Sequence, residues 1–133
     1  MLEDAEVARL AGMSIWEQLD ELITAGTITI DRPRGTPHPK VPEYVYPMDY
    51  GYVDGTDGGD GSGIDVWVGR SPGLRATALI CTYDAVKRNS ELKVAWDCVG
   101  SEIDVIEAFY APQPQAVLVV RRGDEGASGP REP

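Results

Sequence analysis

The sequence predicts an α+β fold in which a small antiparallel β-sheet is rolled into a barrel, with one N-terminal helix and one C-terminal helix. Short runs of alternating or continuous apolar residues recur along the chain, and a capped helical pattern lies toward each end. The length of 133 residues suits one domain with a buried core. We therefore expect a single domain over residues 1–122 and a disordered tail over residues 123–133, which are poor in apolar residues.

The N-terminal helix is predicted between Ser14 and Gly26. Ser14 and Glu17 form the S-x-x-E pattern of a capping box, in which each side chain binds the backbone N–H group of the other residue. Apolar residues then recur at helical spacing: Ile15, Trp16, Leu19, Leu22 and Ile23. Residues 27–31 alternate as a strand. Residues 32–40 cannot extend that strand, because their three prolines lack the N–H group that a sheet requires.

Three further strands are predicted where apolar residues alternate or run continuously: residues 64–69, 74–83 and 91–98. The C-terminal helix is expected to begin at Ser101, whose hydroxyl can cap it, and to end before Pro112. Residues 116–120 form a last apolar strand. Several short strands of this kind favour an antiparallel sheet.

An acidic segment follows a basic one in the first half of the chain. Residues 41–69 contain no lysine or arginine, yet they carry six carboxylates: Glu43, Asp49, Asp54, Asp57, Asp60 and Asp65. Just before them lie Arg32, Arg34, His38 and Lys40. Carboxylates bind hard divalent cations and basic side chains bind phosphate, so together they are typical of a site for a Mg²⁺-complexed polyphosphate. The alternative is a mobile connecting loop, because Asp-Gly pairs are common in tight turns, and the spacing excludes a calcium EF-hand.

Charged residues also lie in the strand-like stretches, and Asp65, Glu91 and Lys93 are the ones that bear on a site. Asp65 interrupts the apolar run 64–68, and an acid there costs stability unless it has a partner, which a metal ion would supply. Alternation places Glu91 and Lys93 on one face of their strand. If that face looks toward the acidic segment, Glu91 can join a metal site and Lys93 can bind a phosphate oxygen. The alternative is an ordinary exposed cross-strand pair.

The net charge of −10 argues against nucleic acid or an anionic membrane as the partner, since both favour a basic face. No apolar run approaches the roughly 18 residues that span a bilayer. The first residues lack the basic start of a signal peptide. We therefore expect a cytoplasmic protein with no nucleic-acid partner and no membrane partner.

Several motifs follow one another in a set order. Asp31-Arg-Pro-Arg-Gly-Thr36 precedes Lys40, and then come Tyr46-Pro-Met-Asp-Tyr-Gly-Tyr52 and Asp60-Gly-Ser-Gly-Ile-Asp65. These motifs resemble the acidic-x-Pro-Lys-Gly-Ser, Y-P-x-N-Y-G-Y and D-x-D-x-x-D elements of the soluble Mg²⁺-dependent inorganic pyrophosphatases. The likeness is greatest to short members of the actinobacterial or clostridial type. Asp84 and the triplet that ends at Lys93 resemble later positions of the family, so the resemblance covers residues 27–69 strongly and 78–96 moderately.

This resemblance implies an OB-like barrel that hydrolyses inorganic diphosphate to two phosphates with a Mg²⁺-activated water. Family members are often homo-oligomers, so a second copy of the chain is an expected partner. The implied metal ligands are Asp60, Asp65, Asp84 and Glu91. The implied substrate-binding residues are Arg34, Lys40 and Lys93. The implied catalytic residues are Asp60, Asp65 and Tyr50, of which the tyrosine would position the attacking water.

The chain departs from the family pattern at three places. Ser62 stands where longer members carry the middle aspartate, which is expected to orient or deprotonate the attacking water. A serine has no charge for this task, and general acid–base help is worth about 10² to 10⁴ in rate. A hairpin is omitted before Tyr46, and Glu43 is the candidate to replace its acid. A C-terminal Tyr-Lys pair is also missing, and Arg121 and Arg122 are the basic substitutes.

These departures leave an alternative function open. The alternative is a degenerate member that binds metal and phosphate compounds as a regulatory protein without hydrolysis, and the neutral Ser62 is its main support. A nucleic-acid-binding OB module is a further alternative. It is disfavoured because the tyrosines of residues 44–52 lie among carboxylates and not along a basic groove.

Overall fold

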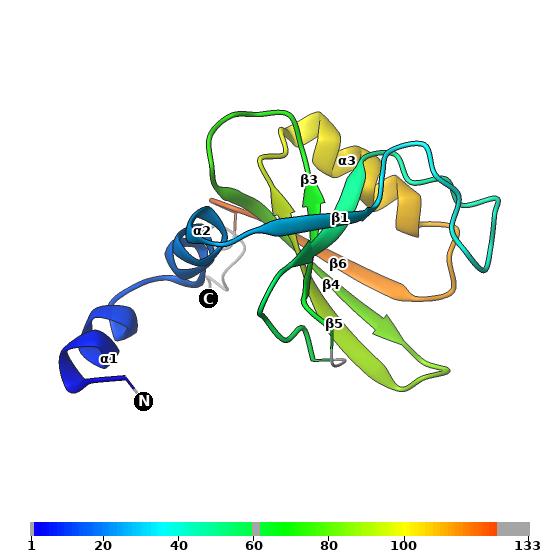
Figure 1. The fold of residues 1–133 in the computed structure, drawn as a ribbon. Coiled ribbons are helices and arrows are strands. Elements are labelled where there is room, and N and C mark those ends of the chain that lie inside the picture. The colour runs from blue at the N-terminus through cyan, green and yellow to red at the C-terminus, as the bar shows by residue number, and fades with distance from the viewer. Residues whose placement is uncertain (1, 60–61, 125–133) are drawn as a thin grey trace, which may run out of the picture.

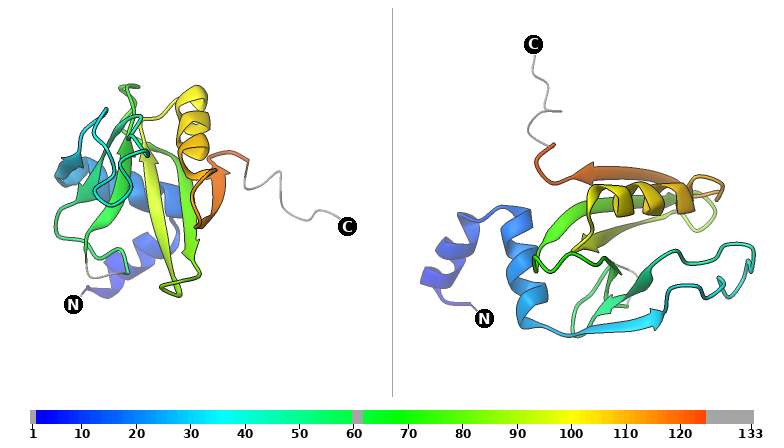
Figure 2. Two further views of the ribbon diagram at one scale, coloured as in Figure 1. Left: turned by 90° about the vertical axis from the view of Figure 1, so that its right-hand side faces the viewer. Right: turned by 90° about the horizontal axis from the view of Figure 1, so that it is seen from above.

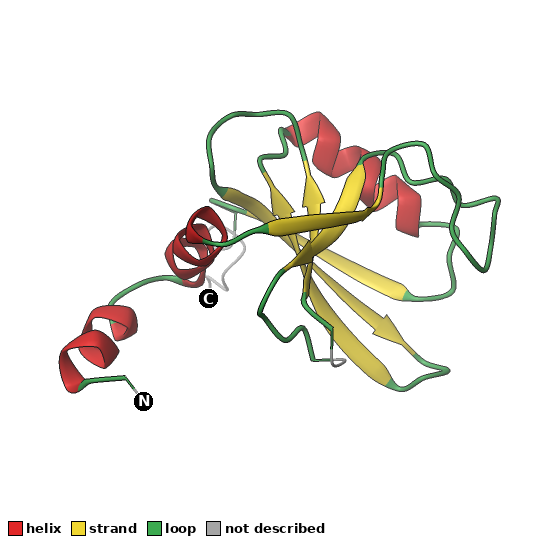
Figure 3. Ribbon diagram, viewed as in Figure 1, coloured by secondary structure: helices red, strands yellow, loops and turns green. Residues whose placement is uncertain are grey.

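The computed structural model describes residues 2–59 and 62–124 and shows an α+β fold (Figure 1, Figure 3). Along the chain the elements are α1 (Asp4–Ala11), α2 (Ile15–Ala25), β1 (Ile28–Arg32), β2 (Asp49–Val53), β3 (Ile64–Val68), β4 (Ala76–Asp84), β5 (Asn89–Trp96), α3 (Gly100–Tyr110) and β6 (Ala116–Arg121). The predicted α+β class is confirmed. The tail predicted over residues 123–133 lies, after residue 124, outside the described residues.

The strands form one mixed sheet in the order β1-β2-β3-β5-β4-β6. Every neighbouring pair is antiparallel except β3 and β5, which run parallel. The prediction of a wholly antiparallel sheet is therefore wrong at this pair. After β3 the chain forms β4, which lies two positions away from β3 in the sheet. It then forms β5, which fills the position between β3 and β4. Among the described residues no pairing joins the edge strands β1 and β6, so a closed barrel is not confirmed.

The predicted strands are all present, with ends close to those expected. The sequence does not predict β2, although the motif of residues 46–52 overlaps it. Asp49 and Gly51 both disfavour a strand, but this segment pairs with β1 on one side and β3 on the other. Pairing on both sides outweighs weak local propensity, and a single stretch of sequence does not reveal it.

The helix starts predicted from the sequence are confirmed for α2 but not for α3. The capping box of Ser14 and Glu17 begins α2 as expected. Ser101 does not cap α3, because the helix begins at residue 100 and the Glu102 carboxylate accepts the Val99 N–H at 2.9 Å. α1 was not predicted. It buries none of its residues and projects from the rest of the chain (Figure 1).

Two hydrophobic clusters pack on the sheet beneath different helices. α3 contributes to a cluster that includes Trp67 and Ile80, and α2 contributes to one that includes Val53 and Val94. Figure 2 shows α3 alongside β6, and α2 at one end of the sheet. Lys93 and Asp97 are the charged residues that this arrangement buries among the described residues. Burying a charge is costly without a partner, so each needs a bonding group nearby.

Gly51 allows β1 and β2 to pack closely. A Cβ atom at this position would lie 1.9 Å from the carbonyl oxygen of Thr29 on β1. Because the strands cannot separate without losing their pairing, we expect Gly51→Ala to lower the free energy of unfolding by about 3 kcal/mol. Urea denaturation followed by circular dichroism measures this loss. Gly12→Ala is the control, since its Cβ would lie 3.7 Å from the nearest atom. Equal unfolding midpoints for the two variants would contradict this account of Gly51.

Candidate functional site

The ammonium of the buried Lys93 is hydrogen-bonded to side-chain oxygens on three neighbouring strands. The Lys93 ammonium on β5 donates hydrogen bonds to Asp65 Oδ2 on β3 at 3.0 Å and to Tyr50 OH on β2 at 3.0 Å. A third bond runs to Glu91 Oε1 on the same strand at 2.9 Å. We name these four residues the Lys93 cluster. All of them were predicted site residues, and the structure brings them together.

The register of the strands positions the Lys93 cluster. Asp65 and Lys93 are paired directly across the parallel strands β3 and β5, so their side chains leave the same face. Glu91 shares that face, as alternation predicted. Tyr50 pairs with Trp67, two residues beyond Asp65 on β3, which places its phenol over the same face. Lys93 is only 6% exposed, so the alternative of an ordinary exposed cross-strand pair is wrong.

Burial and nearby oxygen atoms shift the pKa values of the side chains in the Lys93 cluster. Burial disfavours the charged ammonium, but the oxygens of Tyr50, Tyr110 and Asp65 outweigh it and raise the pKa of Lys93 above its usual range. Burial raises the pKa of the Asp65 carboxyl, against the opposing charge of Lys93. Burial also raises the pKa of the Tyr50 phenol. At neutral pH the lysine is therefore charged, and the phenol keeps a proton that it can donate.

The Lys93 cluster has the groups to bind a phosphate oxygen and a divalent cation. Its ammonium is a charged donor in a site of low dielectric, where such hydrogen bonds are strong. All three of its N–H groups are bonded to Tyr50, Asp65 and Glu91, so a phosphate oxygen would replace one of these acceptors. The side chains of Asp65 and Glu91 remain 21% and 24% exposed, so a hydrated cation can reach them. Mg²⁺ in proteins keeps several waters and binds one or two carboxylates together with substrate phosphates. The cluster fits that mode, although residues 2–59 and 62–124 contain no group of three or more His, Cys, Asp or Glu placed to hold a metal.

Asp84, a predicted metal ligand, closes the turn between β4 and β5. Its Oδ1 atom accepts the backbone N–H groups of Val86 at 2.9 Å and Lys87 at 3.0 Å. The bonds from Lys87 and Val86 hold the pKa of this carboxyl below its usual value. In the described part of the chain no hydrogen bond or ion pair joins Asp84 to the Lys93 cluster, so its role as a ligand stays a prediction.

Two other predicted residues have no described place in the Lys93 cluster. Asp60 lies outside the described residues. Lys40 is exposed on the loop between β1 and β2, where its backbone N–H donates to His38 Nδ1 at 3.0 Å. His38 also accepts the Val41 N–H at 3.2 Å, so this histidine organises the loop that carries Lys40.

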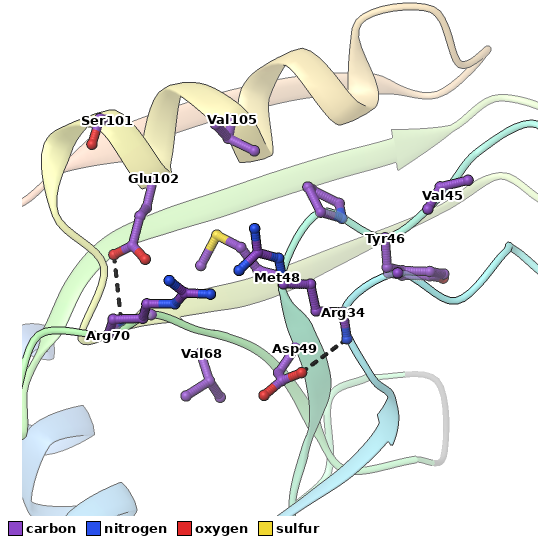
Figure 4. A pocket seen from close by; sticks show the side chains of 13 residues that line it. Arg34, Val45, Tyr46, Met48, Asp49, Val68, Arg70, Ser101, Glu102 and Val105 are labelled. Carbon is purple, nitrogen blue, oxygen red and sulfur yellow. Dashed lines mark hydrogen bonds between the residues drawn. The ribbon is translucent and has the colours of Figure 1, made fainter.

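Arg34, predicted to bind substrate, lies instead at a separate cavity of about 660 Å³. Its backbone N–H donates to Asp49 Oδ1 at 2.9 Å. Its side chain points toward Arg70, which lies just after β3 (Figure 4). The sequence alone does not point to Arg70, because it belongs to no motif and its neighbours carry no charge. Only the fold brings the two arginines to one cavity.

The C-terminal arginines bind helices. Arg122 donates to Asp20 Oδ2 on α2 at 2.9 Å and to the Ala76 carbonyl at 3.0 Å. Arg121 donates to the Asp104 carboxylate on α3. These bonds tie α2 and α3 to the sheet, which gives both arginines a structural role.

Comparison of the chain with protein-family models and with curated proteins gave no match. None of the helices in the described residues combines the length and the apolar character needed to cross a membrane. The features that bear on function are therefore the motifs of the sequence and the geometry of the Lys93 cluster.

Proposed function

We propose that this chain is a Mg²⁺-dependent inorganic diphosphatase, which hydrolyses inorganic diphosphate to two phosphates. The Lys93 cluster carries the proposal, because it holds a buried ammonium against two carboxylates and a phenol. Hydrolysis of a polyphosphate requires positive charge to bind phosphate and carboxylates to hold Mg²⁺. Both kinds of group occur here within hydrogen-bond distance. The order of motifs between residues 31 and 93 is separate support, because it resembles that of the soluble inorganic pyrophosphatases.

Each member of the Lys93 cluster has a role in this reaction. Lys93 exchanges one of its three present acceptors for a phosphate oxygen and neutralises the charge that develops as the bridging P–O bond breaks. Asp65 and Glu91 would hold Mg²⁺, which when bound would lower the pKa of water and shield the phosphate charge. Tyr50 donates its phenol hydrogen to the attacking water and fixes its direction. The water oxygen then attacks one phosphorus, the second phosphate leaves and the water proton passes to solvent.

Several finer expectations remain part of the proposal. Asp60 and Asp84 are the further metal ligands, and Arg34 and Lys40 are the further phosphate-binding residues. The barrel is OB-like, and the strand order with its parallel β3–β5 pair is compatible with a partly open Greek-key barrel. The cytoplasm as compartment and the homo-oligomer likewise stay predictions.

Glu91→Gln is expected to raise the Mg²⁺ concentration for half-maximal phosphate release by about tenfold. The amide oxygen can still accept the hydrogen bond from Lys93, but the charge that attracts the cation is lost. The measurement is phosphate release from diphosphate over a Mg²⁺ titration. Glu107→Gln on the exposed face of α3 is the matched control. An unchanged half-saturating concentration in Glu91→Gln would remove Glu91 from the proposed metal site.

The alternative of a non-hydrolytic regulatory member predicts a different result. Isothermal titration calorimetry would then show Mg²⁺-dependent binding of diphosphate while no phosphate is released. Ser62 is the feature that raises this alternative, because a neutral side chain stands where the resembled family has an acid. Release that depends on Mg²⁺ would exclude it.

A further inference from the structure

A second candidate site lies between the loop that carries Arg34 and the first turn of α3. The cavity measures about 660 Å³, a size typical of sites for small ligands. Apolar side chains form much of its wall: Val45, Tyr46, Met48, Val68 and Val105. Its lining includes none of the four residues of the Lys93 cluster. The cavity is therefore distinct from the Lys93 cluster, and Arg34 is the one residue that it shares with the hydrolysis proposed above.

Arg34 and Arg70 direct their side chains toward each other at this cavity (Figure 4). Arg34 follows β1 and Arg70 follows β3, so the fold brings them together from different parts of the chain. In the described residues their bonds are made by backbone N–H groups, and neither guanidinium group donates a hydrogen bond or forms an ion pair. Two like charges that face each other repel, and an anion bound between them would remove the repulsion.

The carboxylates at the cavity are bound to backbone groups. Asp49 Oδ1 accepts the Arg34 N–H at 2.9 Å. Glu102 Oε1 accepts the Val99 N–H at 2.9 Å and lies 3.5 Å from the Arg70 backbone nitrogen. Figure 4 shows both carboxylates at the base of the arginine that they contact. These bonds fix the two loops and leave the guanidinium groups available to a ligand.

We propose that this cavity binds a small phosphate monoester with an apolar substituent. Guanidinium groups bind phosphate oxygens in a bidentate manner, and two of them can hold one dianionic phosphate. The apolar wall formed by Met48, Val68 and Val105 suits an apolar substituent and offers nothing to a second phosphate. This wall distinguishes the ligand from inorganic diphosphate, which is charged at both ends.

Isothermal titration calorimetry with phenyl phosphate tests the proposal on the full chain without Mg²⁺. We expect saturable binding by the wild-type chain and about tenfold or more weaker binding by Arg70→Gln and by Arg34→Gln, since each removes a charge-assisted pair of hydrogen bonds. Arg75→Gln is the matched control, because it removes the same charge from an exposed arginine outside the cavity. This control and Asp65→Asn should both bind phenyl phosphate as the wild type does.

The apolar wall is tested with two further probes. Inorganic phosphate should bind about tenfold or more weakly than phenyl phosphate, and phenol should show no saturable heat.

Arg70→Lys should bind phenyl phosphate with intermediate affinity, because lysine keeps the charge but loses the planar fork. Diphosphate hydrolysis should be unchanged in Arg70→Gln.

Four outcomes would overturn this inference. They are no saturable binding of phenyl phosphate by the folded wild type, unchanged binding in Arg70→Gln, loss of binding in Asp65→Asn, and equal affinity for inorganic phosphate. Circular dichroism verifies that each variant is folded.

Discussion

Asp65→Asn is expected to lower phosphate release from diphosphate by about 100-fold or more. The amide has nearly the shape of the carboxylate, and its oxygen can still accept the bond that Lys93 donates at 3.0 Å. What the substitution removes is the negative charge that, in the proposed function, attracts Mg²⁺ and balances the ammonium. A colorimetric phosphate assay at saturating Mg²⁺ and diphosphate gives the ratio of the two rates.

Asp54→Asn is the matched control for this experiment. Asp54 belongs to the same acidic segment, but it accepts a hydrogen bond from Thr29 Oγ1 at 2.7 Å and is exposed. This variant should release phosphate at close to the wild-type rate. If Asp65→Asn were equally active, the Lys93 cluster could not be the centre of hydrolysis.

Lys93→Met is expected to lower the free energy of unfolding by about 3 to 5 kcal/mol and to abolish phosphate release. Lys93 is buried, and its removal leaves the carboxylates of Asp65 and Glu91 close together without a cation. Folding raises the pKa of Lys93, so the stabilisation is complete below the unfolded value of about 10.4 and is lost only as the pH rises through the folded value. Urea denaturation at pH 7 therefore measures the whole loss.

Two further variants separate charge from geometry at this position. Lys87→Met removes an exposed lysine from the turn after β4 and should change stability by no more than about 0.5 kcal/mol. Lys93→Arg keeps the charge, but a guanidinium group does not place one nitrogen against three oxygens. It should retain more stability than Lys93→Met while losing most of the phosphate release. A Lys93→Met variant as stable as the wild type would show that the ion pairs of the Lys93 cluster contribute nothing.

Much of the Lys93 cluster could be predicted from the sequence because the relevant signals are local. Glu91 and Lys93 lie two residues apart in a strand, so the pleat alone places them on one face. Asp65 stands in an apolar strand, so it needs a partner. The partner predicted from the sequence is a metal ion, whereas the structure also supplies Lys93, which is paired directly opposite Asp65 on the adjacent strand.

The rest depends on contacts that no local pattern records. The parallel pairing of β3 and β5 follows from where β4 lies in the sheet, and alternation within a strand says nothing about its neighbours. Asp84 was expected to bind metal, but the N–H groups of the next residues occupy one of its oxygens. Arg34 is predicted to bind substrate because it belongs to the motif of residues 31–36. Its neighbour in space is Arg70, and no spacing rule links the two.

The most direct test of the central claim is phosphate release from inorganic diphosphate by the purified chain over a Mg²⁺ titration, run in parallel with Asp65→Asn. The proposed function predicts release that saturates with Mg²⁺ in the wild type and nearly vanishes in the variant. That result would also show that Ser62 supports turnover. Folded wild-type chain that releases no more phosphate than Asp65→Asn at any Mg²⁺ concentration would contradict the claim that the Lys93 cluster is the centre of a diphosphatase.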